Sequence, residues 1–362
     1  TKAAKHVNIL PIYILDNMNA GNYAMGGASR WWLYHSLKAL SASLGNTLSV
    51  YHGNPQTILD DIFTRFEVEA VYWNRCYEPW RMHRDTYIKE HLKAHGIDVH
   101  TCNGSLLWEP WNVKKADGTP YKVFTPFYHN GCFNAEEPRF PLSKPENVNY
   151  VSDQTQIGID ALDLLPKRPW YEQLELHWEI GEVGAHKRFK TFIDEGLFSY
   201  KDGRNLPAKP YVSRLSPYLH FVEISPNKLW HAVRSIGDDK HIEHFCSELG
   251  WREFSYNQLY HNPELPSKNM QSKFDSFAWV ENADNLNAWQ AGKTGVPMVD
   301  AGMRELWQTG YMHNRVRMIV GSFLVKNLRL HWHHGERWFW NTLIDADLAN
   351  NSASWQWIAG CG

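Results

Sequence analysis

Apolar runs that favour β-strands alternate with helix-like patterns through the first third of the chain. The strand-like runs lie at residues 8–15, 47–52, 68–74 and 97–102. Between them, apolar positions recur with helical spacing near residues 28–44, 54–66 and 79–94. Alternation of strand and helix is typical of a parallel sheet with helices on both faces. The pattern therefore predicts an α/β domain over residues 1–102.

The pattern changes beyond this region. Residues 103–154 are rich in Pro, Gly, Asn and aromatic residues and have weak periodicity, which favours a long connection between domains. From residue 155 to 362 strand signals are almost absent and helical spacing dominates. Helices are expected near residues 182–197, 223–236, 240–260, 297–308 and 311–330.

Composition narrows the class of protein. A chain of 362 residues suits two domains, and a net charge of −2 confines any nucleic-acid contact to a local patch. Five cysteines without a C-x-x-C motif suit a reducing cytoplasm and argue against disulfides or structural zinc. No signal peptide or membrane-spanning apolar run is expected. No metal site is expected at the histidines 331, 333 and 334, because no second ligand group stands out.

Aromatic and polar residues are concentrated near the C-terminus. Eighteen tryptophans exceed ordinary usage, and the segment 345–357 combines two acids, two amides and two tryptophans. Asp and Asn favour turns and helix caps. The segment is therefore either a capped helix with core tryptophans or a polar rim around a flat aromatic ligand.

One predicted helix places three unlike side chains on one face. Glu248, Trp251 and Arg252 follow the spacing i, i+3 and i+4. Buried charges are costly, so this face suits a ligand better than a core. A surface ion pair beside a Trp is the alternative.

A second helix, at 311–330, repeats this arrangement. Asn314 and Met318 share a face, whereas Ile319, Phe323 and Leu324 should be core. Arginines and lysines make the region locally basic, which more often indicates a solvated face than a nucleic-acid site.

A polar turn precedes a third helix. Small hydroxyls and free N–H groups at residues 213–216 could hold a phosphate. Ser216 could equally be a helix cap with Pro217 at the first helical position.

Four stretches, at 213–221, 248–254, 312–318 and 345–357, together resemble the flavin domain of the DNA photolyase and cryptochrome family. The resemblance covers nearly the whole chain and is greatest to class I cyclobutane pyrimidine dimer photolyases. It implies an α/β Rossmann-like antenna domain at 1–102, a linker at 103–154 and an all-α FAD-binding and DNA-lesion domain at 155–362. Family members have one further strand before this first one and several further helices at the other end, so both are expected to be missing here.

The resemblance implies an FAD site. The diphosphate and ribitol region would contact Tyr200, Ser213, Leu215 and Ser216. Arg252 would face the phosphates, Arg317 would pair with Asp345, and Asp347 would contact the ring edge. Asn351 would lie by the flavin N5, where many plant cryptochromes carry Asp.

The resemblance also implies a lesion pocket and an electron-transfer chain. Trp251 and Trp357 would hold a flipped-out dimer, Glu248 would bond its base edge, and Arg315 would lie near DNA. Asn314 and Met318 would line the same pocket. Trp355, Trp332 and Trp279 match the tryptophans that carry electrons to the flavin.

Two positions depart from the family pattern. Val212 stands where many relatives have Thr, and Val222 where most have Gly. The first loses a hydroxyl, and the second is expected to add bulk in a tight place.

The implied activity is light-driven repair of cyclobutane pyrimidine dimers in DNA by reduced FAD. Asn314 replaces the His pair of (6-4) photolyases, and Trp251 with Met318 differs from DASH-type cryptochromes. The alternatives are a cryptochrome-like blue-light photoreceptor and an inactive photolyase fragment. A second antenna chromophore of folate, deazaflavin or flavin type, a monomeric state and a bacterial-type cytoplasmic location with DNA complete the expectation.

Overall fold

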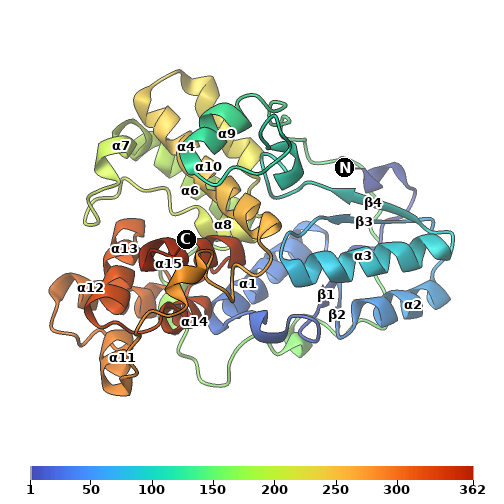
Figure 1. Cartoon of the computed structure of the whole chain (residues 1–362). Coiled ribbons are helices and arrows are strands. Elements are labelled where there is room, and N and C mark those ends of the chain that lie inside the picture. Colours follow the sequence, from blue (N-terminus) through green and yellow to red (C-terminus); the bar gives the residue numbers. More distant parts are fainter. Residues whose placement is uncertain (1, 362) are drawn as a thin grey trace.

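The computed structural model describes residues 2–361. Its N-terminal part contains two pairs of parallel strands joined by helices (Figure 1). The elements are β1 (Ile12–Leu15), α1 (Gly27–Ser43), β2 (Ser49–His52), α2 (Pro55–Arg65), β3 (Ala70–Asn74), α3 (Pro79–Ala94) and β4 (Asp98–Cys102). The alternation of strands and helices predicted from the sequence is confirmed. Proline at the first turn of α2 and α3 suits a helix start, because those N–H groups have no helical partner.

The single parallel sheet expected from the sequence is not formed. β1 pairs only with β2 and β3 only with β4, so the described residues contain two separate two-stranded sheets. A cavity of about 1160 Å³ lies between them and is lined by every residue of β1 and β3. The facing edges of β1 and β3 therefore border this cavity instead of bonding to each other.

Helix α1 joins the strand region to the helical region. Trp32 is fully buried, and its ring packs edge-on against Tyr218 and Trp178 of the helical part. The backbone of Gly26 lies so close to Trp340 that an added Cβ would stand 2.1 Å from its carbonyl oxygen. Only glycine permits this approach.

The connection at 103–154 runs along a long helix, α10 (Lys240–His261). The backbone N–H groups of Leu107 and Trp108 both donate to Glu253 on that helix, at 2.9 and 3.2 Å. Burial raises the pKa of Glu253 to about 7, although the two N–H groups and Arg252 oppose the rise. This buried carboxyl ties the connection to α10.

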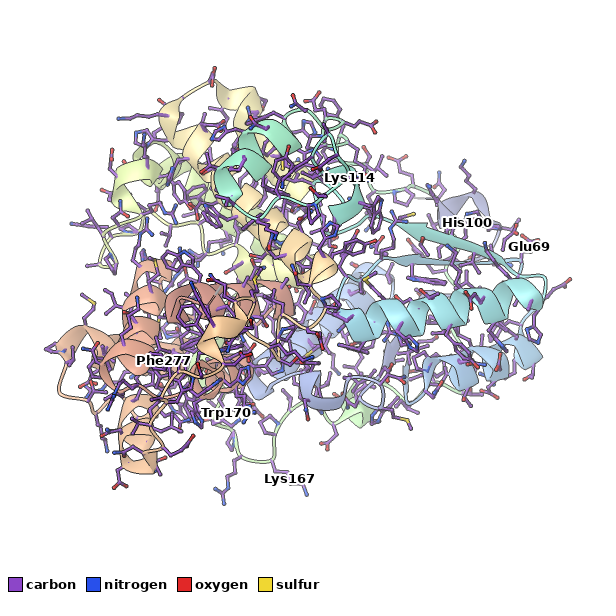
Figure 2. The ribbon with its side chains drawn as sticks, in the orientation of Figure 1. Glu69, His100, Lys114, Lys167, Trp170 and Phe277 are labelled. Atoms are coloured by element: carbon purple, nitrogen blue, oxygen red, sulfur yellow. The ribbon has the colours of Figure 1, made fainter. Side chains whose placement is uncertain are left out.

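The remaining chain is helical, as predicted. Its main helices are α6 (Glu182–Glu195), α8 (Ser216–His220), α9 (Pro226–Ile236), α11 (Ala283–Gln290), α12 (Pro297–Thr309), α13 (Asn314–Ser322), α14 (Trp332–Thr342) and α15 (Leu348–Ala359). Figure 1 shows α15 at the centre of this part, where it contacts α10, α13 and α14. In Figure 2, Phe277 marks the helical side, whereas Glu69 and His100 lie at the far end of β3 and β4. No helix in residues 2–361 is long and apolar enough to cross a membrane.

One predicted helix is wrong in detail. The stretch at 311–330 is α13 followed by a π-helical turn at Phe323–Asn327, and α14 begins soon after. Ile319 was expected in the core but is 42% exposed. It lies with Met318 and Trp357 along a groove, so the apolar stripe of α13 is wider than the surface its neighbours cover.

Candidate functional site

The loop before α15 holds a buried acid that is shared by two helices. Asp345 accepts a hydrogen bond from the Ser216 hydroxyl at 2.5 Å and pairs with Arg317 at 2.8 Å. Arg317 also donates to the Met312 carbonyl at 2.8 Å, so its orientation is fixed. The predicted Arg317–Asp345 pair is present. The alternative role of Ser216 as a helix cap is wrong, because Ser216 is the first helical residue and Leu215 occupies the cap position.

A second acid of the same loop begins α15. Asp347 accepts from the backbone N–H of Asn350 at 2.9 Å, and the Tyr256 hydroxyl donates to its other oxygen. His220 lies 3.5 Å from the same carboxylate. Burial opposes ionisation, but the bonds from His220, Tyr256 and Asn350 outweigh it, so the pKa of Asp347 is lowered. Asp347 is therefore a carboxylate at neutral pH.

Tyr256 was not found from the sequence. It lies four residues after Arg252, whose guanidinium stacks over the Tyr256 ring with 5.1 Å between charge and centroid. Arg252 also donates to Glu253 at 3.1 Å. The i, i+4 spacing was the available signal, because it places Tyr256 on the face already occupied by Arg252.

Asn351 lies one turn into α15 and is almost fully buried. Its side-chain nitrogen donates to the Glu336 carbonyl at 3.1 Å. Because a carbonyl can only accept, this contact fixes the amide orientation and leaves the Asn351 side-chain oxygen without a partner among residues 2–361. Ser352 donates to the Glu336 carboxyl at 2.8 Å. Burial raises the pKa of Glu336 to about 7 despite that bond.

The lesion-pocket candidates of α10 have partners that the sequence did not reveal. Arg204 is 5% exposed and forms a bidentate ion pair with Glu248. The second of its two bonds is 2.8 Å long. Glu248 and Arg252 do not pair with each other, since each has a different partner. Trp251 is 42% exposed, and one contact of its ring is a parallel stack on Phe124 at 3.8 Å.

One candidate on α13 and one on α15 border the same groove. Met318 and Trp357 both line a cavity of about 470 Å³, and Trp357 is 60% exposed. Arg315 donates to the Met318 sulfur at 3.3 Å and to Asn205 at 2.8 Å. Asn314 is exposed at the start of α13, with no side-chain bond recorded in the described chain. No ring contact joins Trp251 to Trp357 within residues 2–361.

Three further candidates were predicted to hold the diphosphate and ribitol region of FAD. Tyr200 is buried against Phe192 and Phe245, and Leu215 is fully buried. Ser213 is half-buried and makes no recorded side-chain bond among the described residues. No side-chain bond joins Tyr200 to Ser213 among residues 2–361, and their roles remain predictions.

The three candidate tryptophans share one buried cluster. Trp355 and Trp332 are fully buried, and Trp279 packs partly buried against the same cluster. An added Cβ on Gly335 would stand 2.1 Å from the Trp355 ring, so this indole rests on the backbone of α14. Trp332 lies one turn before Gly335, and the glycine therefore allows Trp355 to approach the helix that carries Trp332.

Val222 differs from its expected role. It is 41% exposed, so its bulk meets no crowding. Its φ is +58°, in the left-handed region that β-branched residues rarely adopt. The constraint at this position is backbone conformation rather than space.

The donor set fits FAD. Arg317 and Arg252 are half-buried cations of a kind suited to a diphosphate, and Asp347 is a buried carboxylate. The unpartnered oxygen of Asn351 offers an acceptor for a ring N–H. His313 has a buried Nε2 without a partner among the described residues. Charges and free polar atoms of this kind define a flavin-binding helical domain attached to an α/β domain.

Comparisons with known proteins agree with this class. A family profile described as the FAD binding domain of DNA photolyase matches residues 245–362, and one described as DNA photolyase matches residues 1–145. The chain is 42% identical to a deoxyribodipyrimidine photo-lyase of Agrobacterium fabrum, over 98% of this chain and 75% of that protein. It is 32% identical to cryptochrome-1 of Arabidopsis thaliana, over 97% of this chain and 54% of that protein. The chain therefore belongs to the DNA photolyase and cryptochrome family.

One similar solved structure is named as a class III photolyase. A bacterial class III photolyase from Agrobacterium tumefaciens superposes with a TM-score of 0.91 at 41% identity, over 98% of this chain and 74% of that one. The sequence resemblance pointed to class I. The family assignment stands, but this neighbour places the similarity with class III.

Proposed function

We propose that the protein repairs cyclobutane pyrimidine dimers in DNA by light-driven electron transfer from reduced FAD. When bound, FAD supplies light absorption and the transferred electron. One observation carries the proposal: a single helix, α10, carries both the residues proposed to face the lesion and residues proposed to lie by the flavin. Trp251 is 42% exposed and Glu248 is half-buried. About one turn further on, Arg252 stacks over the ring of Tyr256, whose hydroxyl donates to Asp347.

The residues of the pocket would divide the work. Glu248, held by Arg204, would accept a hydrogen bond from the base edge without having to reorient. A dimer can flip out of the duplex at low cost, because the bases at a damaged site are already poorly stacked. The exposed indoles of Trp251 and Trp357 would then hold it. Arg315 would contact phosphates, which give affinity without sequence preference.

Asn351 would face the flavin with its free amide oxygen. That oxygen can accept a hydrogen bond from a protonated ring nitrogen, which favours the reduced cofactor. Trp355, Trp332 and Trp279 would return the cofactor to this state by passing electrons inward. A second chromophore, a monomeric state and a cytoplasmic location with DNA belong to the same proposal, with no residue of this chain assigned to the chromophore.

The test compares repair of a thymine-dimer oligonucleotide in light and darkness, with the flavin spectrum recorded on the same sample. Trp251→Ala and Glu248→Ala should lower repair while leaving flavin bound, and Glu264→Ala, which removes an exposed carboxylate, should change neither. Flavin binding without light-dependent repair by the unmodified protein would favour the photoreceptor function of the cryptochromes. Equal loss of flavin in both pocket variants would show that the pocket assignment is wrong.

A further inference from the structure

Two histidines contact the middle tryptophan of the proposed electron-transfer chain. The His331 ring lies 5.8 Å from that of Trp332, with 26° between their planes, and 5.0 Å from that of Trp279. No ring contact joins Trp279 directly to Trp332 within residues 2–361, and His331 is the one ring there that contacts both. His333 lies 3.8 Å from Trp332. The His331 imidazole thus lies between Trp332 and Trp279, and the His333 imidazole lies against Trp332 alone.

The surroundings of these rings keep them uncharged at neutral pH. Burial lowers the pKa of His333 to about 4, helped by His331, Arg337 and His334. Burial also lowers the pKa of His331, with His334 and Arg337 acting in the same direction and Glu281 against it.

Two acids face this cluster but do not contact His331. The Glu336 carboxyl lies 3.9 Å from His333, and the Glu281 carboxyl lies 3.7 Å from His334. His334 makes no ring contact with any tryptophan in the described chain, so it provides a control.

Loss of an electron would leave a positive charge on Trp332 in a site that water does not reach. Its side chain is fully buried, and its ring nitrogen donates to the neutral amide oxygen of Asn269 at 3.1 Å. A positive charge in such a site is not screened by water, so its energy depends on the rings that touch it. A neutral imidazole stacked on the indole adds polarisable surface without adding charge, whereas an imidazolium would repel the hole.

This inference rests on the proposed function. We propose that His331 and His333 are positioning residues for light-driven flavin reduction: His331 couples Trp332 to Trp279, and His333 stabilises the oxidised form of Trp332. With FAD bound, Trp355 would give one electron to the oxidised cofactor in the light, and Trp332 would then reduce Trp355. Trp332 then takes one electron from Trp279 across His331, and a soluble thiolate finally reduces Trp279. One electron moves inward at each step, and none of the three indoles has to lose a proton.

Three substitutions separate the ring, the charge and the helix cap. His331 also caps α14, because its side chain accepts from the His333 N–H at 3.2 Å. His331→Asn keeps a capping side chain and removes only the ring. His333→Phe keeps a neutral ring against Trp332, and His333→Lys places a fixed cation there. His334→Ala is the matched control.

Flash photolysis of the flavin-loaded protein measures the rate at which the hole leaves Trp332 and the yield of flavin reduction. In His331→Asn the rate should fall by roughly tenfold, equivalent to about 1.4 kcal/mol of barrier. In His333→Lys the yield should fall by roughly a hundredfold, because like charges a few ångströms apart repel strongly outside water. His333→Phe and His334→Ala should stay close to the unmodified protein. Ring-nitrogen NMR of the flavin-free protein should show His333 neutral at pH 6.

The outcomes distinguish the two levels of the proposal. Unchanged photoreduction in both His331→Asn and His333→Lys, with Trp279→Phe slowed, would overturn the role of the histidines and leave the tryptophan chain intact. Unchanged photoreduction in Trp279→Phe as well would remove the chain itself. Repair by chemically reduced protein bypasses the chain and should be equal in all variants. Its absence in the unmodified protein would refute the repair function but not the photoreduction result.

Discussion

Arg204 holds both carboxylate oxygens of Glu248 from a site that is itself almost sealed from solvent. The two residues are 44 positions apart: Glu248 lies in α10, and Arg204 lies in the turn after the short helix α7 (Tyr200–Gly203). The Arg204 guanidinium also stacks 5.5 Å from the Tyr200 ring. The pair fixes one carboxylate orientation beside the exposed face of Trp251. A lesion would therefore meet an acceptor that is already in place.

Arg204→Lys should weaken recognition of damaged DNA. A lysine keeps the charge but cannot hold two oxygens at once, so Glu248 would gain rotational freedom. We expect roughly a tenfold loss of affinity for a dimer-containing oligonucleotide, the scale of one hydrogen bond to a charged group. Fluorescence anisotropy measures it, with undamaged DNA as the reference. Equal binding by the variant would show that Arg204 does not organise the pocket.

Val222→Gly should stabilise the protein. A left-handed conformation costs an L-residue roughly 1–2 kcal/mol, and glycine avoids this cost while losing little contact at an exposed position. Offset by the greater freedom of glycine in the unfolded chain, a gain of about 1 kcal/mol remains. Thermal unfolding tests it. Val212→Gly, at a position without positive φ, should be destabilising, and a gain there would refute the conformational argument.

Glu336 should make stability fall as pH rises. Its pKa is raised from 4.5 to about 7 in the folded protein, so between these values the folded state binds the extra proton. Ionisation then costs stability progressively across this window, by roughly 1–3 kcal/mol in total, and no further above it. Glu336→Gln should remove that part of the pH dependence in denaturant titrations. If the free energy of unfolding of the variant depended on pH as steeply as before, the pH dependence would belong to other groups, such as Glu253.

Gly335→Ala should displace Trp355. The new methyl group would overlap the indole, and overpacking of this kind costs roughly 1–3 kcal/mol. We expect a lower melting temperature together with slower photoreduction of bound flavin. Gly302→Ala, which would press on Val316 instead, should be destabilising without slowing photoreduction. Equal photoreduction in both variants would mean that Trp355 does not begin the chain.

The spacing of residues within one segment correctly predicted features that depend on that segment alone. The start of α3 at Pro79 and the shared face of Glu248, Trp251 and Arg252 follow from periodicity and turn residues within one segment. The pairing of Arg317 with Asp345 came from resemblance to a family rather than from spacing.

Contacts between residues far apart in the sequence could not be predicted. Nothing in the neighbourhood of Arg204 indicates Glu248, and nothing near Glu253 indicates the N–H groups of Leu107 and Trp108. Such contacts depend on how helices meet, which a period of 3.6 residues does not encode. The prediction that Ile319 lies in the core was wrong for the same reason. Periodicity identifies an apolar stripe on a helix but not which part of that stripe is covered by neighbouring elements.

The separation of β1 from β3 has a consequence for folding cooperativity. A pair of strands is marginal on its own, and here no ladder of backbone bonds connects one pair to the other. Side chains nevertheless couple the two pairs, because Ile12 of β1 and Val71 of β3 pack against one small cluster on α2 and α3. In native-state hydrogen exchange, amides of the four strands should exchange at lower free energy than those of α10. The α/β region would then open separately from the helical part.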